Sequence, residues 1–520
     1  MKSRTIWMVG FICFIFVVPL TAYAEGKLDL YKVAAPISSP QINAFQAALE
    51  KDGFIVQRGQ LETIPFVDWC CNKELPSFYG NNVGAPYMTY RMPLGPGQTV
   101  PNRMHWTFRL RPDEAVVLIG RTPPPVNYFS YETFLGLRYF KNEDVRRRVF
   151  GCLGDGANNL TIKTSSTKKN RPYNSETVIV TTADKGIDGR VRKAAQKVGI
   201  PRRIINTEVI PSSLVRMGLE VEADEFVILH RLGFALKGYE NDVDPNNPTG
   251  YVNIPQVVFR VSPAPALNPK QLNLFPAPQL RLRGTGKTEM DLMPAVEELR
   301  KAILAKHTGL KATELETYAG WGSSVLVIDG YDGVQRGVDV LGPSRDALYL
   351  STRPNFTLSD SADEFLIVYG VNHQASGKAA YSSFVVYAED IYPRGPEDPY
   401  HLMLGMVYTY SGEYGDSAKG YIPYNPDARL SQVADKLYAW KVARHCGQNE
   451  PFCLEVKCDN CKLLNLDSVP LPKLFVGFRA YLEKETKTGP IHTEMVYDRV
   501  IKFKDRDQGQ PLIIGSGAGL

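Results

Sequence analysis

The sequence lacks the signatures that would fix a reaction or a strongly charged partner. Its formal net charge is only +5 over 520 residues, and it has no basic tract of the kind that binds nucleic acid or an acidic membrane surface. None of its seven histidines belongs to a His-Glu-x-x-His zinc motif. Nucleic acid is therefore not an expected partner, and a zinc protease is not an expected class.

Three partial motifs fail on inspection. Residues 283–288 resemble a phosphate-binding loop, but Arg281 stands where that motif needs its first glycine. Residues 415–420 contain Gly-Asp-Ser without the Gly-x-Ser-x-Gly elbow of a serine hydrolase. Residues 242–246 alternate oxygen ligands as calcium loops do, but Asn247 replaces the glycine of an EF-hand. The sequence predicts no cofactor and no metal.

A long apolar run occurs once, at the N-terminus. Met8 to Leu20 is almost wholly apolar and is followed by Ala22-Tyr23-Ala24, a small-x-small cleavage pattern. We expect residues 1–24 to be a signal peptide and Glu25 to begin the mature chain; an uncleaved anchor helix is the alternative. No later stretch is long and apolar enough to span a bilayer, so the sequence predicts a soluble protein, secreted or periplasmic, with no membrane attachment after cleavage.

Cysteines support an exported protein, because oxidising compartments preserve disulfides. Eight occur, and Cys13 lies in the leader. Four crowd the loop 446–461: Cys446, Cys453, Cys458 and Cys461. We expect these four to form two bridges and hold no metal, although a zinc knuckle or a redox Cys-x-x-Cys is an alternative. Cys152 is expected to bridge to Cys70 or Cys71, which leaves one cysteine over.

The length exceeds one ordinary hydrophobic core, so more than one domain is expected. Prolines at 263, 265, 269, 276 and 278 predict an extended linker over residues 263–283. The linker divides the chain into an N-terminal α+β half, 25–262, and a C-terminal α+β half, 284–520, which contains the cysteine-rich loop. Helices are expected near 40–52, 187–198, 292–303 and 431–443, with short apolar strands between them.

One pattern recurs in both halves. Asp113 to Leu135 begins with Asp-Glu, five apolar residues and a glycine, then a polar turn and a second apolar run, and we expect it to form a hairpin. Asp363 to Tyr387 repeats this order and is expected to form another. Two later apolar strands each carry one arginine, Arg231 and Arg479. These copies predict two similarly built halves of mostly antiparallel sheet with flanking helices, related by an internal duplication. Recurrence by ordinary hairpin chemistry is the alternative.

The turns inside the repeated pattern supply the candidate site. Asn372, His373 and Lys378 follow the apolar strand of the second copy, and the equivalent turn runs from Arg121 to Asn127. Polar loops on rigid strands commonly carry function. We therefore expect these residues to bind a ligand in a cleft between the halves, with His373 as a candidate acid or base.

Two functions remain open from the sequence. The first is an exported binding or structural protein whose partner is an unknown small molecule or extracellular molecule. The alternative is a secreted hydrolase-like enzyme with its site between the halves, near His373.

Overall fold

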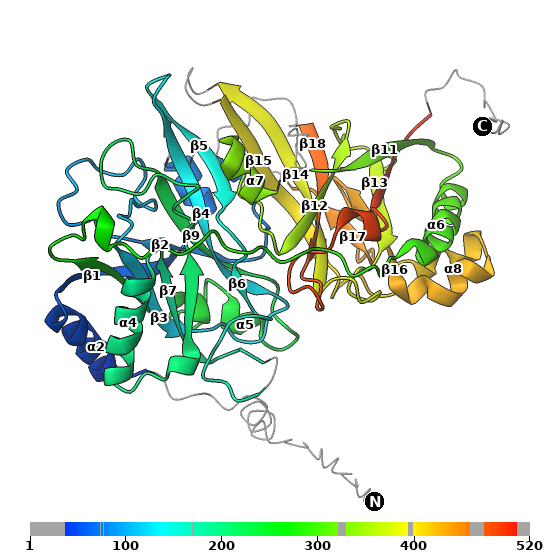
Figure 1. The fold of residues 1–520 in the computed structure, drawn as a ribbon. Coiled ribbons are helices and arrows are strands. Elements are labelled where there is room, and N and C mark those ends of the chain that lie inside the picture. Colours follow the sequence, from blue (N-terminus) through cyan, green and yellow to red (C-terminus); the bar gives the residue numbers. More distant parts are fainter. Residues whose placement is uncertain are drawn as a thin grey trace, which may run out of the picture.

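The computed structural model describes residues 37–506, except 73, 76, 169–170, 321–328, 394–398 and 458–472. The predicted signal peptide and its cleavage site before Glu25 lie outside these residues. Two β-sheets, one from each half of the chain, lie side by side with helices on their outer ends (Figure 1).

The first sheet has ten strands in the order β5-β4-β9-β2-β1-β10-β3-β7-β8, with β6 paired to β4. Their bounds are β1 Phe54–Thr63, β2 Tyr87–Arg91, β3 Ala115–Arg121, β4 Phe129–Phe140, β5 Val145–Cys152, β6 Ala157–Asn158, β7 Glu176–Thr182, β8 Ile205–Val209, β9 Glu225–Leu232 and β10 Val257–Pro263.

Within the described part of the second half, the sheet has nine strands in the order β15-β14-β18-β12-β11-β19-β13-β16-β17. They are β11 Lys311–Ala319, β12 Ala347–Arg353, β13 Phe365–Val371, β14 Tyr381–Pro393, β15 Pro399–Tyr410, β16 Leu437–Ala443, β17 Cys453–Glu455, β18 Lys473–Tyr481 and β19 Arg499–Lys504.

The two sheets share one connectivity. If β6 is set aside, the first strand of each half takes the same place in its sheet, and so does every later strand. The pairs β7–β8 and β16–β17 at matching edges are parallel, whereas the other pairs are antiparallel. The sheets are therefore mixed rather than purely antiparallel. The matching strand orders describe which strands pair. The internal duplication stays a prediction.

The repeated segments are not hairpins. Four strands, β9, β2, β1 and β10, separate β3 from β4, and the equivalent four separate β13 from β14. Alternation of apolar and polar residues predicts a strand but does not identify the strand with which it pairs. Only a short turn of defined type forces two successive strands to pair. The connections 122–128 and 372–380 are longer than such a turn, and each joins two strands that are not neighbours in the sheet.

The helices among the described residues are α2 Ser39–Lys51, α3 Phe66–Cys71, α4 Lys185–Lys197, α5 Glu240–Val243, α6 Met293–Lys306, α7 Gly330–Arg336 and α8 Ala428–Val433. The predicted helix near residues 40–52 is present as α2, and Ser38 caps it through a reciprocal Ser38–Gln41 capping box. Apolar residues of α2 and α4 pack on the first sheet, and those of α6 and α8 pack on the second.

The prediction of a helix over residues 431–443 is wrong. Residues 431–443 contain only the end of α8, after which the chain forms β16. Leu437, Ala439 and Val442 are buried against neighbouring strands and helix α6. Tertiary burial of both faces of this short segment outweighs its helical spacing.

The two sheets share a core. One cluster of buried apolar side chains includes Phe134, Phe150 and Leu229 of the first half, and Leu348, Phe384 and Phe478 of the second. The segment between the halves also packs on the first half: the backbone N–H of Arg281 donates to Asp155, 2.5 Å away. The surface where the sheets meet is therefore part of the folded core.

The cysteines follow the prediction in part. Cys446 and Cys453 form a disulfide with a Cα–Cα distance of 6.0 Å, whereas Cys458 and Cys461 lie outside the described residues. Cys152 is a buried free thiol, so its predicted bridge is wrong. Its sulfur packs instead against Gly330 of α7 in the other half. Among the helices that the structure describes, none is long and apolar enough to cross a membrane.

Tight packing between the halves gives a first prediction. A Cβ atom on Gly151 of β5 would overlap the Gly330 carbonyl and lie 2.8 Å from Val334. Gly151→Ala should therefore destabilise the protein by about 1–3 kcal/mol, because the backbone of α7 has to move away. Denaturant unfolding measures this effect.

The matched control is Gly189→Ala in α4. A Cβ atom there has nothing within 4 Å, and alanine in a helix is favoured over glycine by roughly 0.5–1 kcal/mol. Equal stability of Gly151→Ala and the wild type would contradict the close packing of β5 on α7.

Candidate functional site

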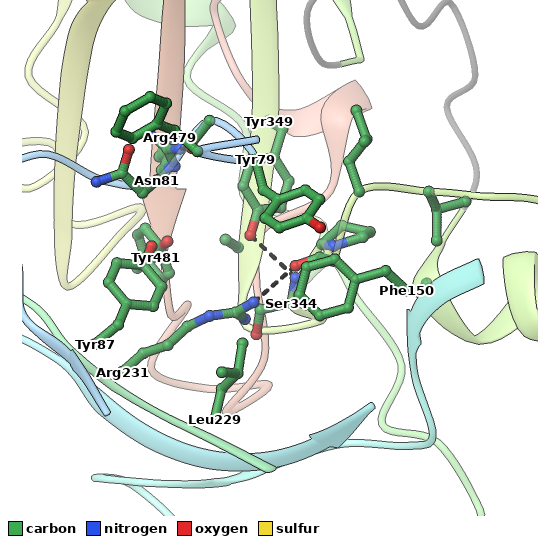
Figure 2. Close-up of a pocket in the computed structure, with 18 of the residues that line it drawn as sticks. Tyr79, Asn81, Tyr87, Phe150, Leu229, Arg231, Ser344, Tyr349, Arg479 and Tyr481 are labelled. Atoms are coloured by element: carbon green, nitrogen blue, oxygen red, sulfur yellow. Dashed lines mark hydrogen bonds between the residues drawn. The ribbon is translucent and has the colours of Figure 1, made fainter. Parts of the chain in front are cut away.

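A cavity of roughly 320 Å³ lies where the two sheets meet (Figure 2). Its apolar wall includes Phe66, Trp69, Phe78, Trp106, Phe150, Leu229 and Leu348. Its polar lining includes Tyr87, Arg231, Arg283, Tyr349, Arg479 and His492. This size and this mixture of aromatic walls with a few polar groups are typical of sites for small organic ligands.

Arg231 enters the cavity from the first sheet. It lies on β9 directly opposite Tyr87 of β2, and its guanidinium carbon is 5.9 Å from the centre of the Tyr87 ring. One terminal nitrogen donates to the Gly342 carbonyl of the other half at 2.7 Å. The other lies 3.1 Å from the Glu132 carboxylate.

Arg479 enters from the second sheet in the same manner. It lies on β18 directly opposite Tyr349 of β12, with its guanidinium carbon 5.9 Å from the centre of the Tyr349 ring. One terminal nitrogen donates to the Gly80 carbonyl of the first half. The other donates to the Tyr387 hydroxyl at 2.5 Å.

These contacts are reciprocal. Gly80 precedes Tyr87 by the same number of residues as Gly342 precedes Tyr349. Each arginine thus binds the loop that leads into the other half's tyrosine strand. The same loops position the tyrosines: the Asn82 backbone N–H donates to the Tyr87 hydroxyl at 3.2 Å, and that of Ser344 donates to the Tyr349 hydroxyl at 3.0 Å.

Burial changes the charge of the groups around the cavity. It raises the pKa of Glu132 to about 8, although the adjacent Arg231 opposes the rise. Burial therefore favours the neutral form of the Glu132 carboxyl, whereas Arg231 favours its charged form. Burial and the nearby Arg283 lower the pKa of His492 to about 4, so this imidazole is neutral.

His373 lies away from the cavity lining and is buried, with 1% of its surface exposed. Its Nδ1 is 2.9 Å from Glu289 and its Nε2 is 3.3 Å from Asp498. Burial opposes a charge on His373, but these two carboxylates outweigh it and raise the pKa to about 10. The side chain is therefore an imidazolium at neutral pH and bridges two chain segments.

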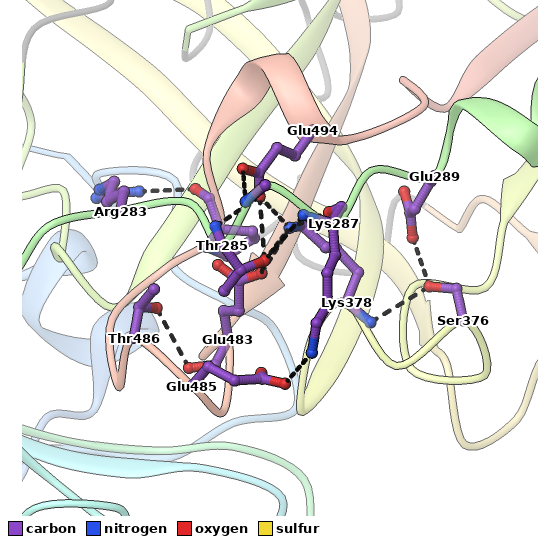
Figure 3. A network of polar contacts seen from close by, with 12 residues as sticks. Arg283, Thr285, Lys287, Glu289, Ser376, Lys378, Glu483, Glu485, Thr486 and Glu494 are labelled. Atoms are coloured by element: carbon purple, nitrogen blue, oxygen red, sulfur yellow. Dashed lines mark hydrogen bonds and ion pairs between the residues drawn. The ribbon is translucent and has the colours of Figure 1, made fainter.

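Lys378 is also held by internal ion pairs (Figure 3). Its Nζ lies 2.5 Å from Glu483 and also pairs with Glu494. It donates to the Lys287 backbone carbonyl at 2.8 Å. This network joins the turn after β13 to the chain that enters the second half.

The remaining predicted site residues have structural contacts too. The Asn372 side chain donates to the Ser411 carbonyl at 3.2 Å. Arg121 is half-buried, with its Nε 3.8 Å from Glu176.

The structure does bring the two predicted turns together. The Gln374 side chain donates to Asn127 at 3.3 Å, so the turns of the two halves are in contact. The cavity is lined by other residues than Arg121, Asn127, Asn372, His373 and Lys378. A ligand site at these five residues stays a prediction.

In the sequence, Arg231 and Arg479 are a shared feature of two apolar strands, and neither was predicted as a site residue. A charged residue inside an otherwise apolar strand was the available signal, because burying a charge is costly unless it is bound. The loop glycines that bind them, and the cavity residues Trp69 and Trp106, had no such signal.

One group of potential metal ligands is close together among the described residues: Cys446, Glu450 and Cys453. Zinc binds thiolate sulfur, and the two cysteines form a disulfide. This group therefore offers no thiolate to a metal.

Comparison with known proteins gives one structural likeness of note. No family model matches the sequence, and no curated protein matches it. An uncharacterised protein from Burkholderia cenocepacia, known from a crystal structure, aligns over 89% of this chain and 91% of its own, with 11% identity and a TM-score of 0.32.

The buried His373 network yields a second prediction. Removing the imidazolium with His373→Ala leaves Glu289 and Asp498 as uncompensated buried carboxylates, which should cost about 3–5 kcal/mol of stability. Thermal unfolding measures the loss, with the exposed His445→Ala as control.

The same contact predicts a pH dependence. The folded-state pKa of His373 is raised from 6.5 to about 10, so its stabilising contribution is complete below pH 6.5 and is lost as pH rises toward 10. His373→Ala should weaken the decline of the thermal midpoint across this range. An unchanged decline would contradict the imidazolium bridge.

Proposed function

We propose that the protein is an exported, non-catalytic binding protein that takes a small apolar or aromatic molecule into the cavity between its sheets. The observation that carries this proposal is the lining of that cavity, where aromatic and apolar side chains surround a few fixed polar groups. Such a surface favours burial of an apolar ligand, at roughly 25 cal/mol for each Å² removed from water.

We also propose that the two halves arose by duplication. The identical strand order supports this. So do the residues that pack on the two repeated glycines: a Cβ on Gly120 would meet Gln256, which precedes β10, and a Cβ on Gly370 would meet Asp498, which precedes β19. The reciprocal arginine contacts add a third correspondence, since each half supplies the same pair of an arginine and a tyrosine.

The alternative, a hydrolase at His373, has less support. A general base needs an imidazole nitrogen with a free lone pair, and both nitrogens of His373 face carboxylates. The nearby Ser376 hydroxyl donates to Glu289 at 2.5 Å. The arrangement lacks the hydrogen bond from nucleophile to base that defines a catalytic serine.

Export is proposed from the leader pattern and is compatible with the disulfide. Expression in a bacterial host with an intact export pathway should give a secreted or periplasmic protein that begins at Glu25. Intact-mass measurement and N-terminal sequencing of that fraction check this outcome. Exported protein that still begins at Met1 would contradict it.

Ligand binding predicts the effect of filling the cavity. Ile64 is half-buried, follows β1 directly and lines the cavity. Ile64→Trp should reduce binding of the neutral fluorescent probe phenylnaphthylamine by about tenfold or more, because the indole takes the space of the ligand. Probe emission during titration measures the dissociation constant.

The control is Ile55→Trp, which adds the same side chain to an exposed position of β1. It should bind the probe as the wild type does. Equal binding of the probe by Ile64→Trp and Ile55→Trp would overturn the proposal that this cavity is the binding site.

A further inference from the structure

The polar lining of the cavity includes two buried arginine side chains. Arg231 is 6% exposed and Arg479 is 4% exposed, and both border a cavity whose other walls are largely apolar or aromatic. Burying a guanidinium costs several kcal/mol unless charges or hydrogen bonds compensate. Two such groups on one small cavity suggest that the cavity is made for a ligand of opposite charge.

We propose that the ligand of this cavity is an acidic amphiphile: a molecule with an aromatic or apolar body and an anionic group, such as a carboxylate or sulfonate, that Arg231 and Arg479 bind. This inference rests on the proposed function of the cavity as a ligand site. It adds the chemical class of the ligand and the residues that select it.

Anchoring fixes the orientation of both guanidinium groups. Arg231 is held by the Gly342 carbonyl and Glu132, and these bonds engage two of the five N–H donors of a guanidinium. Arg479 is held by the Gly80 carbonyl and the Tyr387 hydroxyl. Planar groups fixed in this way present a fork of donors that suits the oxygens of an anion.

The surrounding charges favour an anion. Burial favours the neutral form of Glu132, the carboxyl closest to Arg231, and raises its pKa to about 8. Arg283 also lines the cavity. Of the two acidic residues that line the cavity, Asp329 is shared between Arg345 at 2.5 Å and Arg283 at 3.9 Å, and Asp332 is exposed on α7.

A structural role alone is the competing explanation for the arginines, since each joins one half to the other. The two explanations differ in a measurable way. Arginines that only join the halves have no reason to distinguish an anionic ligand from a neutral one of the same shape, whereas arginines that bind the ligand do.

The experiment compares two fluorescent probes of nearly equal shape, anilinonaphthalene sulfonate and the neutral phenylnaphthylamine, on the full-length mature protein. Only binding that is lost in Ile64→Trp is counted, which removes adsorption elsewhere. We expect the wild type to bind the sulfonate at least about tenfold more tightly, as hydrogen bonds to charged groups imply.

Variants of the two arginines test whether these residues cause the tighter binding of the sulfonate probe. Arg231→Gln and Arg479→Gln should each reduce the ratio of sulfonate affinity to neutral-probe affinity several-fold, whereas Arg231→Lys and Arg479→Lys should retain part of it. Arg190→Gln, a substitution on the outer helix α4, should behave as the wild type does.

The wild-type comparison needs no variant and decides the matter even if a glutamine variant fails to fold. Equal affinity for both probes would overturn the acidic-ligand proposal and leave the binding function standing. Binding of neither probe in the cavity would overturn the proposed function itself.

Discussion

The reciprocal hydrogen bonds from Arg231 to the Gly342 carbonyl and from Arg479 to the Gly80 carbonyl are the interaction on which the arrangement of the two halves depends. Each bond places a buried cation of one sheet on a loop of the other. Because a guanidinium requires partners when it is removed from water, neither sheet can move away without leaving a charge unsatisfied. The cavity between the sheets follows from these contacts. It lies where strands β9 and β18 meet the loops that contain Gly342 and Gly80.

The sequence could predict the elements much better than their pairing. The capped helix beginning at Ser39 and the apolar stripe of α6 follow from local chemistry, and both are present. The partner of β3 does not follow, because β10 lies far along the chain and the strand pattern contains no record of register with it. The shared strand order of the two halves was visible only as two resembling segments.

The candidate site shows the same limit. His373 and Lys378 occur in a polar turn, which on local grounds is either solvated or functional. The structure buries both, because carboxylates from distant segments, Glu289 and Asp498 for one and Glu483 and Glu494 for the other, compensate their charges. Long-range compensation of charge cannot be predicted from the turn itself. Arg231 and Arg479 could be recognised more easily from the sequence. A charged residue within an apolar strand indicates that other groups compensate its charge, even when those groups come from distant segments.

The two sides of the cavity match in backbone position but differ in charge. Ser130 lies opposite Arg231, and Ser383 lies opposite Arg479. Two residues further along each strand the halves differ: Glu132 contacts Arg231, whereas Val385 stands at the matching place in the second half. A carboxyl beside one guanidinium weakens its pull on an anion whenever that carboxyl is ionised. For the acidic ligand proposed above, the two ends of the cavity are therefore unequal in charge when Glu132 is ionised, above its pKa of about 8, and this inequality favours one orientation of the ligand over the other.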